Sequence, residues 1–369
     1  MKYFSIFAKV LQYHKLTCNI RAKFPSMSTI KAHTAVDEIS HDGKFLRTES
    51  GFRNKVGHGK YGAEPNRYHL YISYACPWAN RCLAVLQLKG LENVIGVSVV
   101  HPTWQKTRPK DLEDGHTGWV FREKDDPPLS TPTGYGSFPC TGVVPDNINN
   151  VRSVRELYEL SSDSTGKYSV PVLWDTKTST IVNNESSEII RMFNSTFNTF
   201  AKNPDLDLYP EDLREKIESV NGWIYPNIND GVYRCGFAKS QAAYEKAAED
   251  LFQSLERVED ILSHQRYLTG DRFTEADIRL FMTLVRFDEV YVVYFKTNCK
   301  KIEEYPNMMN YCRELYQKMK GAINMDHIKT HYYTSHPSLN FYGIIPKGPN
   351  TVEKLLQPHD RDHFPASKF

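Results

Sequence analysis

The chain has 369 residues, of which 40% are hydrophobic and 24% charged, the composition of an ordinary soluble globular protein. Its formal net charge of +2 gives no support for a nucleic-acid partner, and no run approaches the roughly 18 apolar residues that span a bilayer. The seven cysteines are scattered and form no Cys-x-x-Cys pair, so we expect neither a disulfide scaffold nor a zinc site. A reducing compartment, the cytoplasm, is favoured. The length favours two domains.

The first 65 residues show no sustained periodicity and are predicted to form an N-terminal arm (1–65). No acidic residue precedes Asp37, whereas six lysines and arginines do. A basic, acid-poor start is typical of mitochondrial transit peptides, which makes the mitochondrion the alternative location. A disordered basic arm and a translation start at Met27 remain open.

A mixed α/β domain is predicted over residues 66–200. Its elements are a strand at 68–73, a helix from Pro77, a strand at 94–100, a helix at 151–160, strands at 170–175 and 180–183, and a helix from 185. The strand–helix–strand start predicts a parallel pair with a crossover helix. Between these elements lies an insertion, 101–150, rich in proline and glycine. Irregular segments of that length in compact domains are usually functional.

Strand patterns disappear after about Pro210, and an all-helical domain is predicted over 208–345, followed by a tail at 346–369. The stretch 244–262 spaces its apolar residues by three and four, as one face of a helix requires. Thr274 is predicted to cap the next helix, with Asp277 as the acid of a capping box.

Cys76 lies between the first strand and its helix, with Pro77 at the position where a missing N–H costs nothing. The helix amides and the positive end of the dipole would then stabilise a thiolate, which is the nucleophilic form. With no Cys-x-x-Cys partner, the resolving thiol must come from outside the chain. Glutathione is the obvious donor.

Two further motifs predict a binding site for glutathione. Val170, before Pro171, would present its backbone N–H and C=O to a peptide ligand. Glu185 and Ser186 begin a helix, where free amides and a hydroxyl bind an anion and the carboxylate suits an ammonium group. Each motif alone has a structural explanation, an edge proline or a helix cap. Together with Cys76 the two motifs predict a glutathione-binding site.

The order of these motifs resembles the glutathionyl-hydroquinone reductases, or Xi-class glutathione transferases, within the Omega-like group. The matching runs are 76–79, 170–175, 184–191, 231–238, 268–270, 274–280, 285–288, 326–332 and 343–349. The resemblance covers roughly residues 40–349. It implies a thioredoxin-like N-terminal domain, an all-α C-terminal domain (the glutathione transferase fold) and a homodimer.

The resemblance also assigns roles to residues. Trp119 would cover glutathione, and Val170, Glu185 and Ser186 would hold its backbone and γ-glutamyl end. Tyr233 would be the proton donor, while Tyr291 and Tyr332 would lower the pKa of the Cys76 thiol and contact substrate. Lys167 falls where an arginine would meet the glycyl carboxylate, and it lacks the bidentate fork of arginine. Asn80 replaces the usual histidine, with little expected effect.

The predicted activity is the reduction of S-glutathionyl-hydroquinones by glutathione through a mixed disulfide on Cys76. The resemblance implies no metal. His327 and His331 are one helical turn apart, a possible metal pair, but no third ligand accompanies them and capping or core hydrogen bonding is favoured. Two alternatives remain open at this stage. One is a broader Omega-type thioltransferase or dehydroascorbate reductase, and the other is a non-catalytic module that only binds glutathione. The substrates are small molecules in either enzymatic case, with no membrane partner.

Overall fold

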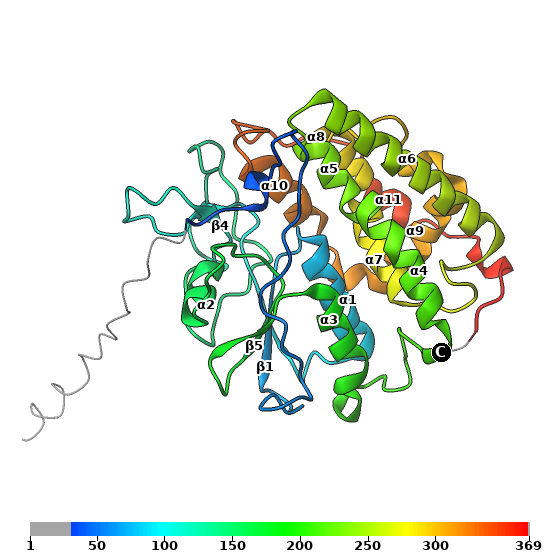
Figure 1. Cartoon of the computed structure of the whole chain (residues 1–369), viewed down its shortest axis with the longest axis horizontal. Coiled ribbons are helices and arrows are strands. Elements are labelled where there is room, and N and C mark those ends of the chain that lie inside the picture. Colours follow the sequence, from blue (N-terminus) through cyan, green and yellow to red (C-terminus); the bar gives the residue numbers. More distant parts are fainter. Residues whose placement is uncertain (1–30, 368–369) are drawn as a thin grey trace, which may run out of the picture. The chain divides into compact units, whose positions relative to one another are not determined.

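A four-stranded mixed sheet organises the first half of the chain in the computed structural model, which describes residues 31–367 (Figure 1). Its order is β2-β1-β5-β6, with β1 Tyr68–Ile72, β2 Gly96–Val99, β5 Val172–Asp175 and β6 Thr180–Asn183. β1 and β2 run parallel, with Leu70 opposite Val97, whereas β1–β5 and β5–β6 are antiparallel. The predicted parallel pair is confirmed.

Helices cover both faces of this sheet. α1 (Pro77–Lys89) connects the two parallel strands and packs against α3 (Ser186–Arg191) and α7 (Glu275–Arg286). α2 (Val154–Leu160) lies on the opposite side of the sheet from α1 and α3 (Figure 1). Every residue of β1 is buried as a result, which explains why this strand carries no polar alternation.

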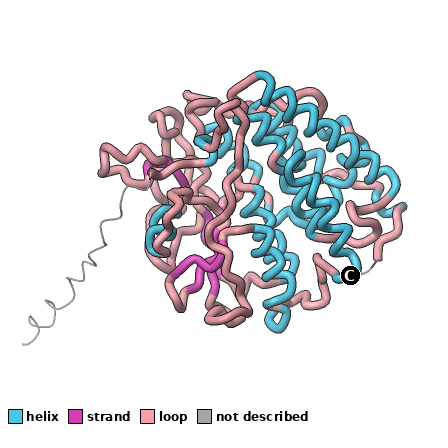
Figure 2. The backbone as a smooth tube through the Cα atoms, in the orientation of Figure 1, coloured by secondary structure: helices cyan, strands magenta, loops and turns pink. Residues whose placement is uncertain are grey.

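The second half of the described chain is helical, and Figure 2 shows its helices gathered on one side of the strands. They are α4 Arg214–Ile224, α5 Gly231–Phe237, α6 Gln241–His264, α7 Glu275–Arg286, α8 Val292–Tyr294, α9 Pro306–Met319, α10 Met325–Ser335 and α11 Thr351–Leu355. α7 is buried along its whole length. Among the described residues, none of these helices combines the length and apolar character needed to cross a bilayer.

Two local predictions for this half are confirmed. α6 buries Leu251, Leu255, Val258 and Leu262, the apolar face that the spacing gave. The carboxylate of Asp277 accepts the backbone N–H of Thr274 at 2.9 Å and completes a capping box at the start of α7. Short π-helical turns at Tyr225–Asn229 and Phe287–Tyr291 interrupt the α-helical runs beside Tyr233 and at Tyr291. Such turns occur often at functional sites.

The insertion 101–150 contains only a short antiparallel ribbon, β3 (Gln105–Lys106) with β4 (Thr117–Gly118). Its far end returns to the sheet, where the backbone of Val144 pairs with Val99. The irregular character predicted for this segment is confirmed, and β4 leads directly into Trp119.

The segment 32–65 is not a free arm, contrary to expectation. Phe45, Val56 and Tyr61 belong to the buried core. The chain runs along β6, where the backbone N–H of Asn54 donates to Val182 O at 3.0 Å, and it reaches the helical half, where Lys239 N–H donates to Gly43 O at 2.9 Å. These isolated backbone contacts impose no side-chain period, which is why periodicity did not reveal them. The transit-peptide interpretation concerns residues 1–36, of which 1–30 lie outside the described range.

Candidate active site

Cys76 is the N-cap residue of α1, directly after the loop that follows β1, and Pro77 occupies the first helical position. The thiol donates a hydrogen bond to the backbone carbonyl of Val170, with Sγ 3.3 Å from the oxygen. Its side chain is partly exposed in a cavity of about 910 Å³. The predicted junction of strand, cysteine, proline and helix is present.

Burial raises the pKa of the Cys76 thiol. The backbone N–H of Ala79, the charge of Arg286, the N–H of Trp78 and the charge of Arg47 all lower it, and together they offset only part of the rise. The predicted influence of the helix amides is therefore present. The groups that lower the pKa are amides and guanidiniums, and the role expected of Tyr291 and Tyr332 in lowering it stays a prediction.

The residues predicted to hold glutathione lie together on the sheet side of the cavity. Glu185 caps α3, accepting from the backbone N–H and the hydroxyl of Ser187 at 3.0 and 2.9 Å. Although burial raises the pKa of Glu185, the Ser187 N–H and the Arg81 charge lower it below its ordinary value, so the carboxylate is ionised. Val170 precedes a cis peptide bond to Pro171. Ser186 is buried beside Glu185 and lines the same cavity.

The segment after residue 32 supplies a further wall of the cavity, which the sequence did not predict. Ser50 donates to a carboxylate oxygen of Glu185 at 3.2 Å. Arg47 pairs with Asp230 at 2.5 Å and lies over the rings of Trp78 and Tyr233, 4.1 and 5.0 Å from their centroids. A guanidinium in such a position gains both ion-pair and cation–π stabilisation. Arg47 thus links the segment to the helical half.

Trp119 lines the cavity and stacks on the ring of His331, with centroids 4.4 Å apart and an interplanar angle of 28°. Trp104 meets both rings edge-on. This packing fixes the indole of Trp119 between the insertion and α10. Trp119 stands at the wall of the cavity, and its predicted role in covering glutathione stays a prediction.

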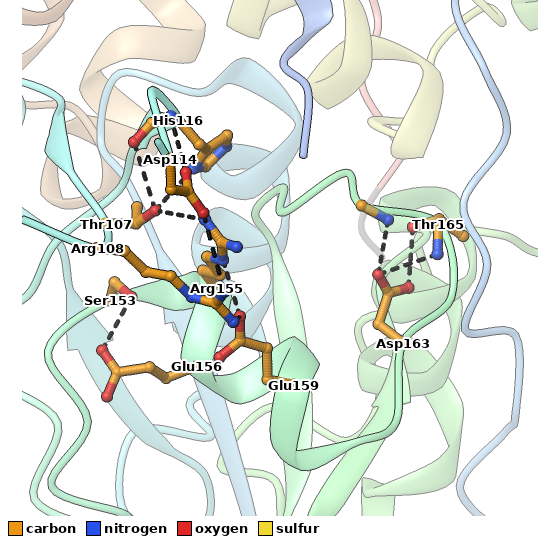
Figure 3. A network of polar contacts seen from close by, with 11 residues as sticks. Thr107, Arg108, Asp114, His116, Ser153, Arg155, Glu156, Glu159, Asp163 and Thr165 are labelled. Carbon is orange, nitrogen blue, oxygen red and sulfur yellow. Dashed lines mark hydrogen bonds and ion pairs between the residues drawn. The ribbon is translucent and has the colours of Figure 1, made fainter. Parts of the chain in front are cut away.

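A polar network holds the loops that carry Trp119 and Lys167 (Figure 3). Arg155 of α2 pairs with Asp114 at 2.6 Å and Glu159 at 2.8 Å, and Thr107 meets the imidazole of His116 at 2.8 Å. In the neighbouring loop the carboxylate of Asp163 accepts from Thr165 and from the backbone N–H of Gly166. These contacts tie the insertion to α2 on one side and set the turn before Lys167 on the other.

Lys167 lines the cavity, but its ammonium already has partners. Nζ is 2.7 Å from a carboxylate oxygen of Glu38 and 2.9 Å from the hydroxyl of Thr48. Burial lowers the pKa of Lys167, whereas Glu38 raises it. Its charge is therefore matched within the protein before any ligand arrives, and the assignment to a glycyl carboxylate stays a prediction.

The three tyrosines form one chain of hydroxyl contacts. Tyr332 OH lies 2.5 Å from Tyr233 OH and 3.1 Å from Tyr291 OH. Burial raises the pKa of all three phenols, so each remains protonated at neutral pH. Tyr233 and Tyr332 line the cavity, whereas Tyr291 lies behind Tyr332 and is fully buried.

One cavity therefore unites eight of the nine predicted site residues, with Tyr291 as the exception. The eight are Cys76, Trp119, Lys167, Val170, Glu185, Ser186, Tyr233 and Tyr332. The cavity brings a thiol, a helix N-terminus with a carboxylate, and phenolic proton donors to one space. Such an arrangement can bind a zwitterionic peptide at one end and an aromatic group at the other.

Sequence reasoning missed Arg47, which it placed in the arm, and it did not reveal the contacts of Asn80. Asn80 is fully buried, its amide N–H donates to Ala322 O at 2.8 Å, and its carbonyl oxygen accepts from Arg286. The expectation of little effect on catalysis stays a prediction, although the side chain clearly joins α1 to the helical half. Burial inside the helix interface, which spacing cannot show, distinguishes it from a surface asparagine.

The two histidines of α10 bond to different carbonyls of the insertion. His327 Nε2 is 2.6 Å from Thr141 O, and His331 Nδ1 is 2.9 Å from Pro102 O. Within the range 31–367, no group of three or more metal-ligating side chains occurs that could hold an ion. The pair therefore serves to anchor the insertion on α10.

Comparisons with known proteins agree with this arrangement. Residues 75–196 match the model of the glutathione S-transferase N-terminal domain, and residues 241–314 match that of the C-terminal domain. The mixed sheet followed by helices is the glutathione transferase fold, as predicted.

Two curated relatives are glutathionyl-hydroquinone reductases. The chain is 46% identical to YqjG of Escherichia coli K12, over 89% of this chain and 95% of that protein. It is 43% identical to PcpF of Sphingobium chlorophenolicum, over 85% of this chain and 92% of that protein.

Solved structures give the same result. The glutathione transferase Xi of Phanerochaete chrysosporium matches with a TM-score of 0.76 and 46% identity, covering 87% of this chain and 97% of that one. The glutathione-bound structure of YqjG matches with a TM-score of 0.74 and 43% identity, covering 85% of this chain and 96% of that one. The chain belongs to the Xi-class glutathione transferases, the family of the glutathionyl-hydroquinone reductases.

Proposed function

We propose that this protein reduces S-glutathionyl-hydroquinones to hydroquinones, with glutathione as co-substrate and Cys76 as nucleophile. The observation that carries the proposal is the shared cavity, in which Cys76 and the paired hydroxyls of Tyr233 and Tyr332 line one space. A thiol alone suits many reactions of glutathione. A thiol beside protonated phenols suits one in which an aromatic carbon leaves and needs a proton.

In the first step the Cys76 thiolate attacks the sulfur of the glutathionyl group on the ring. The new S–S bond forms as the sulfur–carbon bond breaks, and the electron pair passes to the ring carbon. Tyr233 supplies the proton that this carbon takes up, because its raised pKa keeps it protonated and its hydroxyl can be resupplied through Tyr332. The products are the hydroquinone and a Cys76–glutathione mixed disulfide.

In the second step a second glutathione, as thiolate, attacks the glutathionyl sulfur of the mixed disulfide. Oxidised glutathione leaves, Cys76 returns as a thiolate, and the proton of the incoming thiol restores Tyr233. Glu185, with the amides at the start of α3, would hold the γ-glutamyl end, and the backbone of Val170 would pair with the cysteinyl residue of the peptide. Trp119 would cover the bound peptide.

A broader thioltransferase or dehydroascorbate reductase would use the same thiol and peptide site. It would have no need of the buried hydroxyl chain, because a thiolate leaving group needs no proton from the enzyme. A non-catalytic module would have no need of a cysteine at the N-cap of α1. The tyrosine chain and the N-cap thiol therefore favour the hydroquinone-conjugate reductase.

The decisive experiment is a turnover assay with a glutathionyl-hydroquinone and glutathione, comparing the parent enzyme with Cys76→Ser. We expect release of hydroquinone and oxidised glutathione by the parent and loss of both by the variant. Cys82→Ser is the matched control, since Cys82 is buried in the same helix and does not line the cavity. A parent enzyme without activity on the conjugate would exclude the proposed function.

We further propose a cytoplasmic homodimer. Resolution of a mixed disulfide by glutathione needs a compartment rich in reduced glutathione, which the cytoplasm provides. Light scattering of the purified chain tests the dimer, and a mass near that of one 42.6 kDa chain would contradict it.

A further inference from the structure

Arg286, the last residue of α7, is fully buried and grips the loop that precedes Cys76. Its Nη2 donates to the carbonyl of Tyr74 at 2.8 Å, and its Nε donates to the carbonyl of Ala75 at 3.2 Å. Nη1 donates to Met282 O at 2.5 Å within α7, and Nη2 also donates to the side-chain oxygen of Asn80. The guanidinium thus ties the helical half to the two peptide units directly before the nucleophile.

All of these acceptors are neutral. Within the described range 31–367, no carboxylate lies within 4.0 Å of the Arg286 guanidinium. Two other buried arginines differ in this respect, since Arg67 pairs with Asp175 at 2.7 Å and Arg155 with Asp114 at 2.6 Å. A buried charge is costly unless an opposite charge compensates it. Arg286 therefore carries a positive charge for which the folded protein supplies no permanent anion.

The ionisable groups around Arg286 are those of the active site. Burial raises the pKa values of Cys76, Tyr291 and Tyr332, and the charge of Arg286 opposes the rise in each of them. Burial also lowers the pKa of the His331 imidazole, and Arg286 lowers it further. The guanidinium thus favours negative charge on the thiol and disfavours a competing positive charge beside it.

We propose that Arg286 is a positioning residue whose buried guanidinium, bonded to Tyr74, Ala75 and Asn80, supplies a positive charge that stabilises the Cys76 thiolate. The proposal rests on the proposed function in one respect, that Cys76 is the nucleophile. Arg286 does not touch the sulfur. It acts on the thiol through the two peptide units that it holds and through the electrostatic field of its charge. Ionisation of the thiol gives the guanidinium its missing counter-charge, and transfer of the sulfur into the mixed disulfide removes it again.

The test measures the ionisation of Cys76 and needs no turnover. The rate of alkylation of Cys76 by iodoacetamide is followed against pH by peptide mass spectrometry, which separates Cys76 from the exposed Cys299. An opposite charge within ~4–6 Å lowers a pKa by about 1–3 units. Because Arg286 lies one peptide unit beyond the thiol, we expect Arg286→Met to raise the pKa by about one unit and to slow alkylation about tenfold near neutral pH. Arg286→Lys keeps the charge and should recover part of the rate.

Arg361→Met is the matched control. Arg361 is also fully buried, and its guanidinium donates to the carbonyls of Leu262, Gln265 and Arg266 at 2.7, 2.6 and 2.9 Å. It does not line the cavity. Its replacement should lower the unfolding temperature and leave the alkylation profile unchanged. An equal shift in both variants would show a general loss of structure and would overturn the proposal, as would a wild-type profile in Arg286→Met.

Asn80→Asp provides a second variant if Arg286→Met does not fold. It retains Arg286 and gives it a carboxylate partner of the same shape, so the thiol pKa should rise as it does when the charge is removed. A profile identical to wild type would overturn the proposal. If the parent enzyme shows no turnover but the variants shift the pKa of the Cys76 thiol as expected, the proposed reaction would be wrong and the role of Arg286 would be supported.

Discussion

Replacing Tyr233 with phenylalanine removes one hydroxyl and leaves the ring in place. The lost bond to Tyr332, 2.5 Å long, contributes about 1 kcal/mol to the free energy of unfolding, so the variant should remain folded. The phenyl ring still packs against Trp78 and Phe295. Any large change in activity would therefore come from the missing proton donor.

A general acid contributes typically 10²–10⁴-fold to a rate, or about 3–5 kcal/mol. We expect a loss of that size in kcat on a glutathionyl-hydroquinone, whose carbon leaving group needs the proton. On a mixed disulfide between glutathione and a small thiol, the leaving group is a thiolate with a pKa near ~8.5, and the loss should be only a few-fold. The assay measures both substrates with the same enzyme preparation, by release of hydroquinone and of free thiol.

Tyr333→Phe is the matched control for this comparison. Tyr333 follows Tyr332 in α10 and is equally buried, but its hydroxyl donates to the carbonyl of Glu289 at 3.2 Å and it does not line the cavity. It should retain activity on both substrates. Equal losses on the two substrates in Tyr233→Phe would refute the role of Tyr233 as the acid of the hydroquinone reaction.

Three further outcomes follow from the same contacts. Glu185→Gln should raise the KM for glutathione roughly 10- to 100-fold with a smaller change in kcat, because a charged hydrogen bond is worth about 1.5–3 kcal/mol. Glu188→Gln, on the same helix but outside the cavity, is its control. An unchanged KM in Glu185→Gln would contradict the assignment. Asp277→Ala removes the acceptor of three buried donors, Leu268 N–H, Thr274 N–H and Tyr311 OH. It should lower the free energy of unfolding, measured in urea, by several kcal/mol, at about 1–3 kcal/mol per unpaired group. A loss below about 1 kcal/mol would argue against this role of Asp277. Burial lowers the pKa of His69, His101 and His336 to about 4, so between the ordinary value of 6.5 and about 4 the unfolded chain binds more protons than the folded one. Stability should therefore be complete above pH 6.5 and be lost as the pH falls through this window, by at most about 3 kcal/mol per histidine. Urea titrations at several pH values check it, with a smaller slope expected for His69→Gln, and an unchanged slope in that variant would contradict the reasoning.

Local sequence signals predicted those parts of the site that depend on one turn of chain. Residue type alone predicts the helix starts at Cys76–Pro77 and at Glu185–Ser186, and the structure has both. The resemblance to a family brought Tyr233, Tyr291 and Tyr332 to the list, but only the fold shows that their hydroxyls form one chain with Tyr332 in the middle.

The remainder depends on contacts between distant segments. Arg47 could not be recognised because its segment pairs with β6 through isolated backbone bonds and carries no period. Arg286 and Asn80 are separated by more than two hundred residues and meet only when α1 packs on α7. A distant contact also changes the environment of Lys167, which the sequence did predict as a site residue. Its charge is paired with Glu38, which lies in the segment that was predicted to be an arm.

The hydrogen bond from the Cys76 thiol to Val170 has a consequence for the enzyme between turnovers. The carbonyl that accepts the thiol proton is the one that the peptide ligand is proposed to use, and the sulfur bonded to it is neutral and turned toward the backbone. Neutral thiols resist oxidation to sulfenic acid far better than thiolates do. Arrival of glutathione would release the sulfur only when a reductant is present to repair it. We therefore expect this hydrogen bond to limit the oxidation of Cys76 by peroxide until glutathione takes its place.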